Sequence, residues 1–320
     1  MTRHASFVPR GVIPAVILPF TPDLEVDEPA FRRHLRHVAG TRGVAALTVN
    51  AHSMEASSLS AADQRLTMDI ALDEVGDRMP LVHGVYADGS IEAARLAAQA
   101  VAQGASALLV FPPNPFTLGY RPEMVVEHFR RVADAAGDVP LIVFNYPLAI
   151  GQGYRTELIV RLAEAVPTIA AIKDWCNDPT QSAENVRVLQ SLARPVNVLS
   201  AHSAWLMQSL VAGCAGLLSG SGSVIADLQA DLFDAVQRAD LAEAQRLAER
   251  IAPLMAVFYA APTVDMHNRM KEALVMLGRQ ERVYVRPPLV SIDDDERARL
   301  RAALVASGLL APRAQASAAG

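Results

Sequence analysis

Short apolar stretches alternate with longer amphipathic stretches along most of the chain. Eight of the short stretches are rich in β-branched residues, and most are apolar almost without interruption, which is typical of parallel strands buried on both faces. The pattern therefore predicts eight strands, at residues 13–20, 45–50, 81–86, 107–111, 141–146, 169–173, 196–200 and 216–219.

The segments between these strands carry apolar residues at helical spacing, and many end near a glycine or proline that stops a helix. They predict helices at residues 28–39, 61–75, 91–103, 122–136, 156–165, 183–192, 204–212 and 224–238. Three further helical patterns follow the last of these units, at residues 241–260, 264–278 and 294–307.

Eight consecutive strand–helix units without a break in composition predict an α/β fold, a (β/α)8 TIM barrel with a C-terminal helical extension. The barrel is expected at residues 1–238, the extension at 239–310, and a disordered Ala/Ser/Gly-rich tail at 311–320. A doubly wound sheet is the competing fold. It requires a glycine fingerprint after the first strand, and "PFTPDLEVD" contains none.

Composition narrows the class of protein. The 320 residues are 51% hydrophobic and carry a formal net charge of −5, which argues against a nucleic-acid partner. Two cysteines, Cys176 and Cys214, cannot build a disulfide framework, so a reducing cytoplasm is expected. The chain has no apolar run long enough for a membrane span and no signal-peptide pattern. Because neither His-Glu-x-x-His nor paired Cys-x-x-Cys occurs, we expect no metal and no cofactor.

One residue stands out against this apolar pattern. Lys173 ends the sixth predicted strand, and barrel active sites lie at the carboxyl ends of the strands. Burial there would lower the pKa of the amine, and a neutral amine can form a Schiff base with a carbonyl compound. A structural ion pair with Asp174 is the alternative. Alternation along a strand turns the two side chains apart, which weakens this alternative without removing it.

Five segments carry a family resemblance: "GVIPAVILPFTPDLEVD", "MEASSL", "FNYP", "AIKD" and "MKEAL". Together they resemble the dihydrodipicolinate synthase / N-acetylneuraminate lyase family, class I aldolases and dehydratases that act on 2-oxo acids. The resemblance extends over roughly residues 11–310. It implies a (β/α)8 barrel that forms a homotetramer or homodimer, a small 2-oxo acid as substrate, and Lys173 as the Schiff-base lysine.

The resemblance also shows where this chain departs from the family. The loop that reads Gly-Thr-Thr-Gly-Glu in the family reads "AHSME" here, so His52 replaces a relay threonine, while Ser53 keeps a hydroxyl. Ser53 and the backbone amides of His52 and Ser53 are expected to bind the substrate carboxylate. The family's catalytic tyrosine is Phe144 here, and Tyr146, two residues on, is the candidate substitute.

Four further positions complete the candidate site. Asn114 stands where the family has a tyrosine, although "PPNP" is equally consistent with a rigid turn. In "SAHSAW", Ala201 and His202 follow the seventh strand, and His202 joins His52 as a candidate proton carrier. Trp175 is expected either to border the substrate or simply to pack.

These residues lead to one hypothesis and two alternatives. The hypothesis is a lyase that acts on a pyruvate-type 2-oxo acid through a Schiff base on Lys173, as an aldolase or a dehydratase/hydratase-aldolase. Because His52 and Phe144 replace both the relay threonine and the catalytic tyrosine of the family, the lysine-pathway synthase reaction is not expected. Ala149, in place of the synthase arginine, also argues against a second substrate carboxylate. The alternatives are a non-catalytic oxo-acid-binding protein and a deaminase of a cyclic imino acid.

Overall fold

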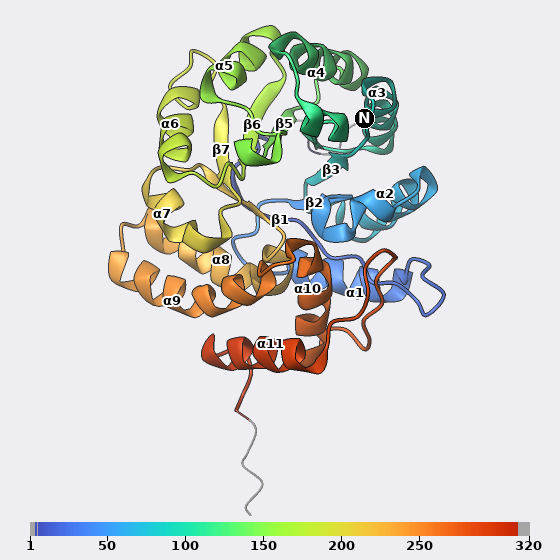
Figure 1. Ribbon diagram of the computed structural model, residues 1–320, viewed down its shortest axis with the longest axis vertical. Helices are drawn as coiled ribbons and strands as arrows, with labels where there is room; N and C mark the ends of the chain where they lie inside the picture. Colours follow the sequence, from blue (N-terminus) through green and yellow to red (C-terminus); the bar gives the residue numbers. More distant parts are fainter. Residues whose placement is uncertain (1–3, 5, 313–320) are drawn as a thin grey trace, which may run out of the picture.

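The computed structural model describes residues 4 and 6–312, so most of the expected tail lies outside the described residues. Eight parallel strands form one curved sheet surrounded by helices (Figure 1). The strands are β1 (Gly11–Pro14), β2 (Leu47–Val49), β3 (Leu81–Val85), β4 (Ala107–Val110), β5 (Leu141–Asn145), β6 (Ile169–Asp174), β7 (Asn197–Ser200) and β8 (Gly216–Ser219).

The sheet closes on itself to form the barrel. Strands from β2 to β8 pair in sequence order, β1 pairs with β8, and single bridges join β1 to the segment that carries β2. At the β1–β8 seam, a side chain at Gly216 would collide with the backbone of Gly11, so the close approach of these strands requires glycine. The predicted TIM-barrel fold is therefore confirmed.

The barrel helices follow the strands in order, and their starts have clear chemical causes. Asp27 caps the first helix through the Ala30 amide, and Ser60 and Asp63 form a capping box at the second. The helices are α1 (Glu28–Ala39), α2 (Ala61–Val75), α3 (Ser90–Gln103), α4 (Pro122–Ala136), α5 (Thr156–Ala165), α6 (Pro179–Leu189), α7 (Leu206–Val211) and α8 (Gly222–Gln237).

Two element boundaries differ most from the prediction. The first strand was expected at residues 13–20, but it ends at Pro14. Ala15 and Val16 still bond to β8 and β2, and the chain then leaves the sheet, since the Ile17 amide donates to the Ser223 hydroxyl at 2.8 Å. Helix α6 begins at Pro179, four residues before its predicted start, because the Asp178 carboxylate caps the Thr180 and Gln181 amides.

Three more helices, α9 (Leu241–Phe258), α10 (Met266–Met276) and α11 (Asp294–Ala306), follow the barrel. Figure 1 shows them gathered beside α8 and α1, with α10 reaching toward the barrel mouth. Among the described residues, no helix is both long and apolar enough to cross a bilayer.

A buried ion pair ties this extension to the loop after β2. Lys271 of α10 donates to Glu55 Oε1 at 2.5 Å and to the Tyr284 carbonyl at 2.9 Å. The Arg286 amide donates to the other Glu55 oxygen at 2.9 Å. Both charged side chains are almost fully buried. The extension therefore holds the loop that carries His52 and Ser53.

Lys271→Met should be strongly destabilising, because it leaves the Glu55 carboxylate buried without its partner. We expect the free energy of unfolding to fall by about 3–5 kcal/mol, measured by urea denaturation. Adding Glu55→Gln should recover most of the loss. Arg95→Gln, which breaks the exposed Arg95–Glu92 pair, is the control and should cost less than about 1 kcal/mol. A Lys271→Met loss no larger than this control would contradict the assignment.

Candidate active site

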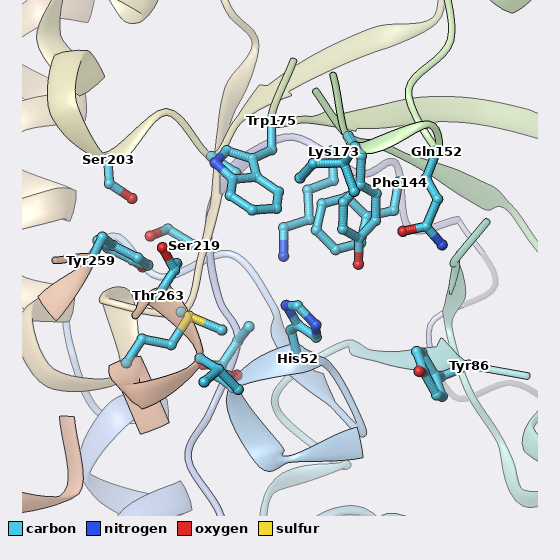
Figure 2. A pocket seen from close by; sticks show the side chains of 18 of the residues that line it. His52, Tyr86, Phe144, Gln152, Lys173, Trp175, Ser203, Ser219, Tyr259 and Thr263 are labelled. Atoms are coloured by element: carbon cyan, nitrogen blue, oxygen red, sulfur yellow. The ribbon is translucent and has the colours of Figure 1, made fainter. Parts of the chain in front are cut away.

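A cavity of about 320 Å³ opens at the carboxyl ends of the strands, where barrel active sites lie (Figure 2). Its walls come from loops that follow the strands and from the C-terminal extension. Most of the predicted site residues line it: His52, Ser53, Asn114, Phe144, Tyr146, Lys173, Trp175 and Ala201.

Lys173 projects into this cavity from β6. Its side chain is 5% exposed, and its Nζ lies 4.1 Å from the centroid of the Phe144 ring on the neighbouring strand. Figure 2 shows the amine pointing across the cavity toward His52. Loss of hydration lowers the pKa of Lys173 from 10.5 to about 7. The neutral form of this amine is therefore far more populated at pH 7 than that of an ordinary lysine.

Asp174 points to the opposite side of β6 and does not pair with Lys173. Its carboxylate accepts hydrogen bonds from Asn145 (3.1 Å), from Asn185 (3.3 Å) and from the Cys176 amide (3.2 Å). Burial alone would raise the pKa of Asp174, but these bonds and His202 hold it below its usual value. The ion pair that competed with a Schiff-base role for Lys173 is therefore not formed.

His202 lies with Asp174 and not with Lys173. Its Nε2 is 3.4 Å from Asp174 Oδ2, and its ring stacks on Trp205 with centroids 3.8 Å apart. The Ala201 amide donates to the Asp174 carbonyl at 2.9 Å, which extends the β6–β7 pairing by one residue. Ala201 then faces the cavity and His202 faces away from it. The expected position of His202 at the catalytic mouth is corrected accordingly.

Asp174, Cys176 and His202 also offer metal-ligand atoms within 4.8 Å of one another. The carboxylate is already hydrogen-bonded, and the Cys176 thiol donates to the Asp178 carbonyl at 3.3 Å. Burial raises the pKa of this thiol, which favours the protonated form over the metal-binding thiolate. Asp174, Cys176 and His202 thus form a hydrogen-bonded cluster that holds the end of β6 in place.

His52 lies opposite Lys173, on the short helix η1 (His52–Met54). Its ring centroid is 6.0 to 6.3 Å from those of Phe111, Phe144, Tyr146 and His267. Burial lowers the pKa of His52 to about 3, so the imidazole is neutral at pH 7 and has one nitrogen free to accept a proton or hydrogen bond.

The neighbouring Ser53 uses its hydroxyl within the protein. The oxygen lies 2.9 Å from both the Ala15 and Val16 carbonyls, to which it donates. The expected side-chain contact with a carboxylate is therefore absent in this geometry. The amides of His52 and Ser53 begin η1, where N–H groups have no acceptor inside the helix and are available to a ligand.

Tyr146 and Phe144 lie together on the β5 side of the cavity. Their ring centroids are 4.3 Å apart, and Tyr146 is 5.4 Å from Trp175. Burial raises the pKa of Tyr146 well above its usual value. Its phenol thus stays protonated and can donate a hydrogen bond, while the raised pKa makes it a weak proton donor.

Several cavity residues were not predicted from the sequence, among them Tyr86, Gln152, Tyr259 and His267. His267 of α10 lies 6.1 Å from His52 between ring centroids, and burial lowers its pKa to about 4. A signal existed: His267 precedes Lys271 by four residues, so both share one helix face. If this helix face had been placed over the barrel mouth, His267 would have been predicted as a cavity residue.

The fold and the cavity define a class: a (β/α)8 barrel whose mouth presents a desolvated lysine without an acidic partner among the described residues. A model of the dihydrodipicolinate synthetase family matches residues 8–307, and the chain belongs to this family.

Individual relatives agree with this family. The chain is 31% identical over 303 residues to an uncharacterized DapA-like lyase of Halobacterium salinarum, covering 94% of this chain and 95% of that protein. It is 29% identical to a 4-hydroxy-tetrahydrodipicolinate synthase of Methanothrix thermoacetophila, with 91% and 95% covered. The crystal structure of YagE, a prophage protein of Escherichia coli K12 in complex with pyruvate, aligns with a TM-score of 0.87 at 25% identity, over 95% of this chain and 100% of that chain.

Lys173→Met should stabilise the fold, because it removes a poorly hydrated amine. The pKa of Lys173 is 10.5 when exposed and about 7 in the folded protein, so between these values the unfolded chain binds more protons. The gain should be on the order of a few kcal/mol below about pH 7 and should vanish as the pH approaches 10.5. Urea denaturation across this pH range measures it, and a gain independent of pH would contradict the assignment.

Proposed function

We propose that this protein is a lyase that acts on a pyruvate-type 2-oxo acid through a Schiff base on Lys173. One observation carries the proposal: the Lys173 amine lies desolvated in the cavity at the barrel mouth, with its pKa lowered to about 7. A neutral amine held in this way is the form that attacks a carbonyl carbon.

The reaction then follows from amine chemistry. The amine adds to the C2 carbonyl, water leaves, and the resulting iminium draws electrons from a bond at C3, which permits aldol cleavage or dehydration. The substrate carboxylate, next to the reacting carbon, would be held by the amides of His52 and Ser53. Figure 2 shows His52 across the cavity from Lys173, and the two amides belong to the loop that the Glu55–Lys271 pair fixes in place.

Proton transfer would fall to the neutral groups beside the amine. The free ring nitrogen of His52 can take up the proton of the reacting hydroxyl, although its lowered pKa makes it a weak base. The Tyr146 phenol is a weak acid because burial raises its pKa, so its role is to donate a hydrogen bond to the developing charge. Together they would replace the phenol relay that the chain lacks at Phe144. His202 is left out of this scheme, since it bonds to Asp174 on the other side of β6.

The relatives support a lyase while leaving the substrate open. YagE was crystallised with pyruvate, and the same protein, 26% identical to this chain over 305 residues, carries the name "Putative 2-dehydro-3-deoxy-D-gluconate aldolase". Among the described residues, the cavity lining has no cation besides Lys173. This favours an aldolase or hydratase-aldolase over the synthase, whose reaction requires a second carboxylate site. Assembly into a homotetramer or homodimer remains an expectation from the family.

Borohydride reduction with pyruvate tests the Schiff base directly. The chain has only two lysines, and Lys271 is bonded to Glu55, so we expect a stable adduct on Lys173 alone, found by peptide mass spectrometry. Lys173→Met should lose the adduct completely. An unmodified Lys173 across a panel of 2-oxo acids would exclude the proposal, as would adduct formation that is unaffected in the variant. Binding without turnover would favour the oxo-acid-binding alternative, and ammonia release the deaminase.

His52→Gln tests the proposed proton acceptor. Removal of a general base typically lowers turnover by about 10²–10⁴-fold, whereas trapping of pyruvate on Lys173 should persist because the amine is unchanged. Turnover is measured as pyruvate released in a coupled assay. His37→Gln, on α1 and outside the cavity, is the matched control. Equal turnover in the two variants would remove His52 from the mechanism.

A further inference from the structure

Aromatic side chains are concentrated on one side of the cavity. Phenylalanine, tyrosine and tryptophan make up 5% of the chain, yet at least one lies at the end of each consecutive strand from β3 to β6. These strand-end aromatic residues all line the cavity except Phe111, which packs behind it. We call this set the aromatic wall: Tyr86, Phe111, Phe144, Tyr146 and Trp175.

The aromatic wall is continuous. Adjacent ring centroids are 5.4 Å apart for Tyr86 and Phe111, 5.1 Å for Phe111 and Phe144, 4.3 Å for Phe144 and Tyr146, and 5.4 Å for Tyr146 and Trp175. These distances are typical of favourable aromatic pairs. The wall passes directly beneath the reacting amine, because Lys173 Nζ lies 4.1 Å from the Phe144 centroid.

The other side of the cavity presents four hydroxyl groups, two of which already bond within the protein. Figure 2 shows Ser203, Ser219, Tyr259 and Thr263 across from Tyr86, with Lys173 between. Ser219 shares a 2.8 Å hydrogen bond with Ser221, and the Tyr259 hydroxyl accepts from the Ser221 amide at 3.1 Å. Two of these four hydroxyls thus already have partners in the protein, which weakens the case for a substrate tail bearing many hydroxyls.

The charges that line the cavity are the second constraint on the substrate. Apart from Lys173, the described residues that line the cavity include no lysine, arginine, aspartate or glutamate. A second carboxylate or phosphate on the substrate would therefore be desolvated without a counter-ion, which is costly. The group beyond the reacting carbons must be uncharged.

From this wall and this absence of charge we infer that the substrate is a 2-oxo acid with an aryl group at its far end, cleaved to pyruvate and an aryl aldehyde. The inference rests on the proposed function of Lys173. The aryl ring lies along the aromatic wall, with the half-buried Trp175 as one of its contacts. Adjacent rings of the wall meet at 35° to 85°, so a substrate ring can make edge or offset contacts with more than one of them.

The bond changes balance without a co-reactant other than water. On the Lys173 iminium, the C4 hydroxyl gives its proton to a base, the C3–C4 bond breaks, and its electron pair moves to the iminium. This leaves an enamine on Lys173 and a free aryl aldehyde. Protonation at C3 and hydrolysis of the new iminium then release pyruvate and restore the amine.

Two substrates that differ only beyond the reacting carbons test the inference. We expect the full-length enzyme to cleave 4-hydroxy-4-phenyl-2-oxobutanoate with a kcat/KM at least about tenfold above that for 3-deoxy-2-oxogluconate, measured as released pyruvate. Trp175→Leu should reduce this preference by roughly the 2- to 12-fold that one aromatic contact provides.

Trp205→Leu is the matched control, because it removes the only other tryptophan from a neighbouring loop, outside the cavity lining. It should leave the preference unchanged. Equal or faster cleavage of the polyhydroxylated substrate, or equal effects of the two tryptophan variants, would overturn the inference.

Trapping of pyruvate on Lys173 distinguishes failure of the aryl specificity from failure of the proposed function. If borohydride fixes pyruvate on Lys173 but the phenyl substrate is not preferred, only the aryl specificity is wrong. If no adduct forms on Lys173, the proposed function fails and the aryl inference fails with it.

Discussion

A buried amine without a counter-ion is the constraint on which the candidate site depends. Lys173 is surrounded by barrel walls that supply ring faces and no carboxylate, so the protonated form loses its hydration without compensation. The same dry surroundings keep His52 deprotonated and Tyr146 protonated. The cavity thus holds an amine, an imidazole and a phenol that can all be neutral near pH 7. Proton donors and acceptors are available there without fixed charges.

The second lysine shows what a counter-ion changes. Lys271 is as deeply buried as Lys173, and burial lowers its pKa to about 8 even though Glu55 opposes the shift. With the carboxylate 2.5 Å away, this amine is committed to an ion pair and to holding the loop after β2. One lysine is therefore structural and the other chemically available, and the difference lies in the partner that each side chain meets, not in its burial.

Much of this arrangement was accessible from the sequence, for identifiable reasons. Parallel strands buried on both faces leave continuous apolar runs, which is why all eight strands and the barrel were predicted. Alternation correctly placed Asp174 behind Lys173. Side-chain direction just past a strand end was harder: His202 was expected at the mouth, but the sheet pairing continues through Ala201 and turns it away. His267 was missed because its place depends on how α10 packs on the barrel. That packing brings it beside His52, which lies more than 200 residues earlier in the chain.

The scarcity of lysine has a consequence for the outside of the molecule. Of the 29 basic side chains, only Lys173 and Lys271 are lysines, and both are buried. The rest of the positive charge is arginine, whose guanidinium stays protonated and does not form stable imines with aldehydes under neutral conditions. The described surface therefore exposes no lysine amine to a reactive carbonyl compound in solution. An aldehyde that meets this protein finds its lysine nucleophile only by entering the barrel.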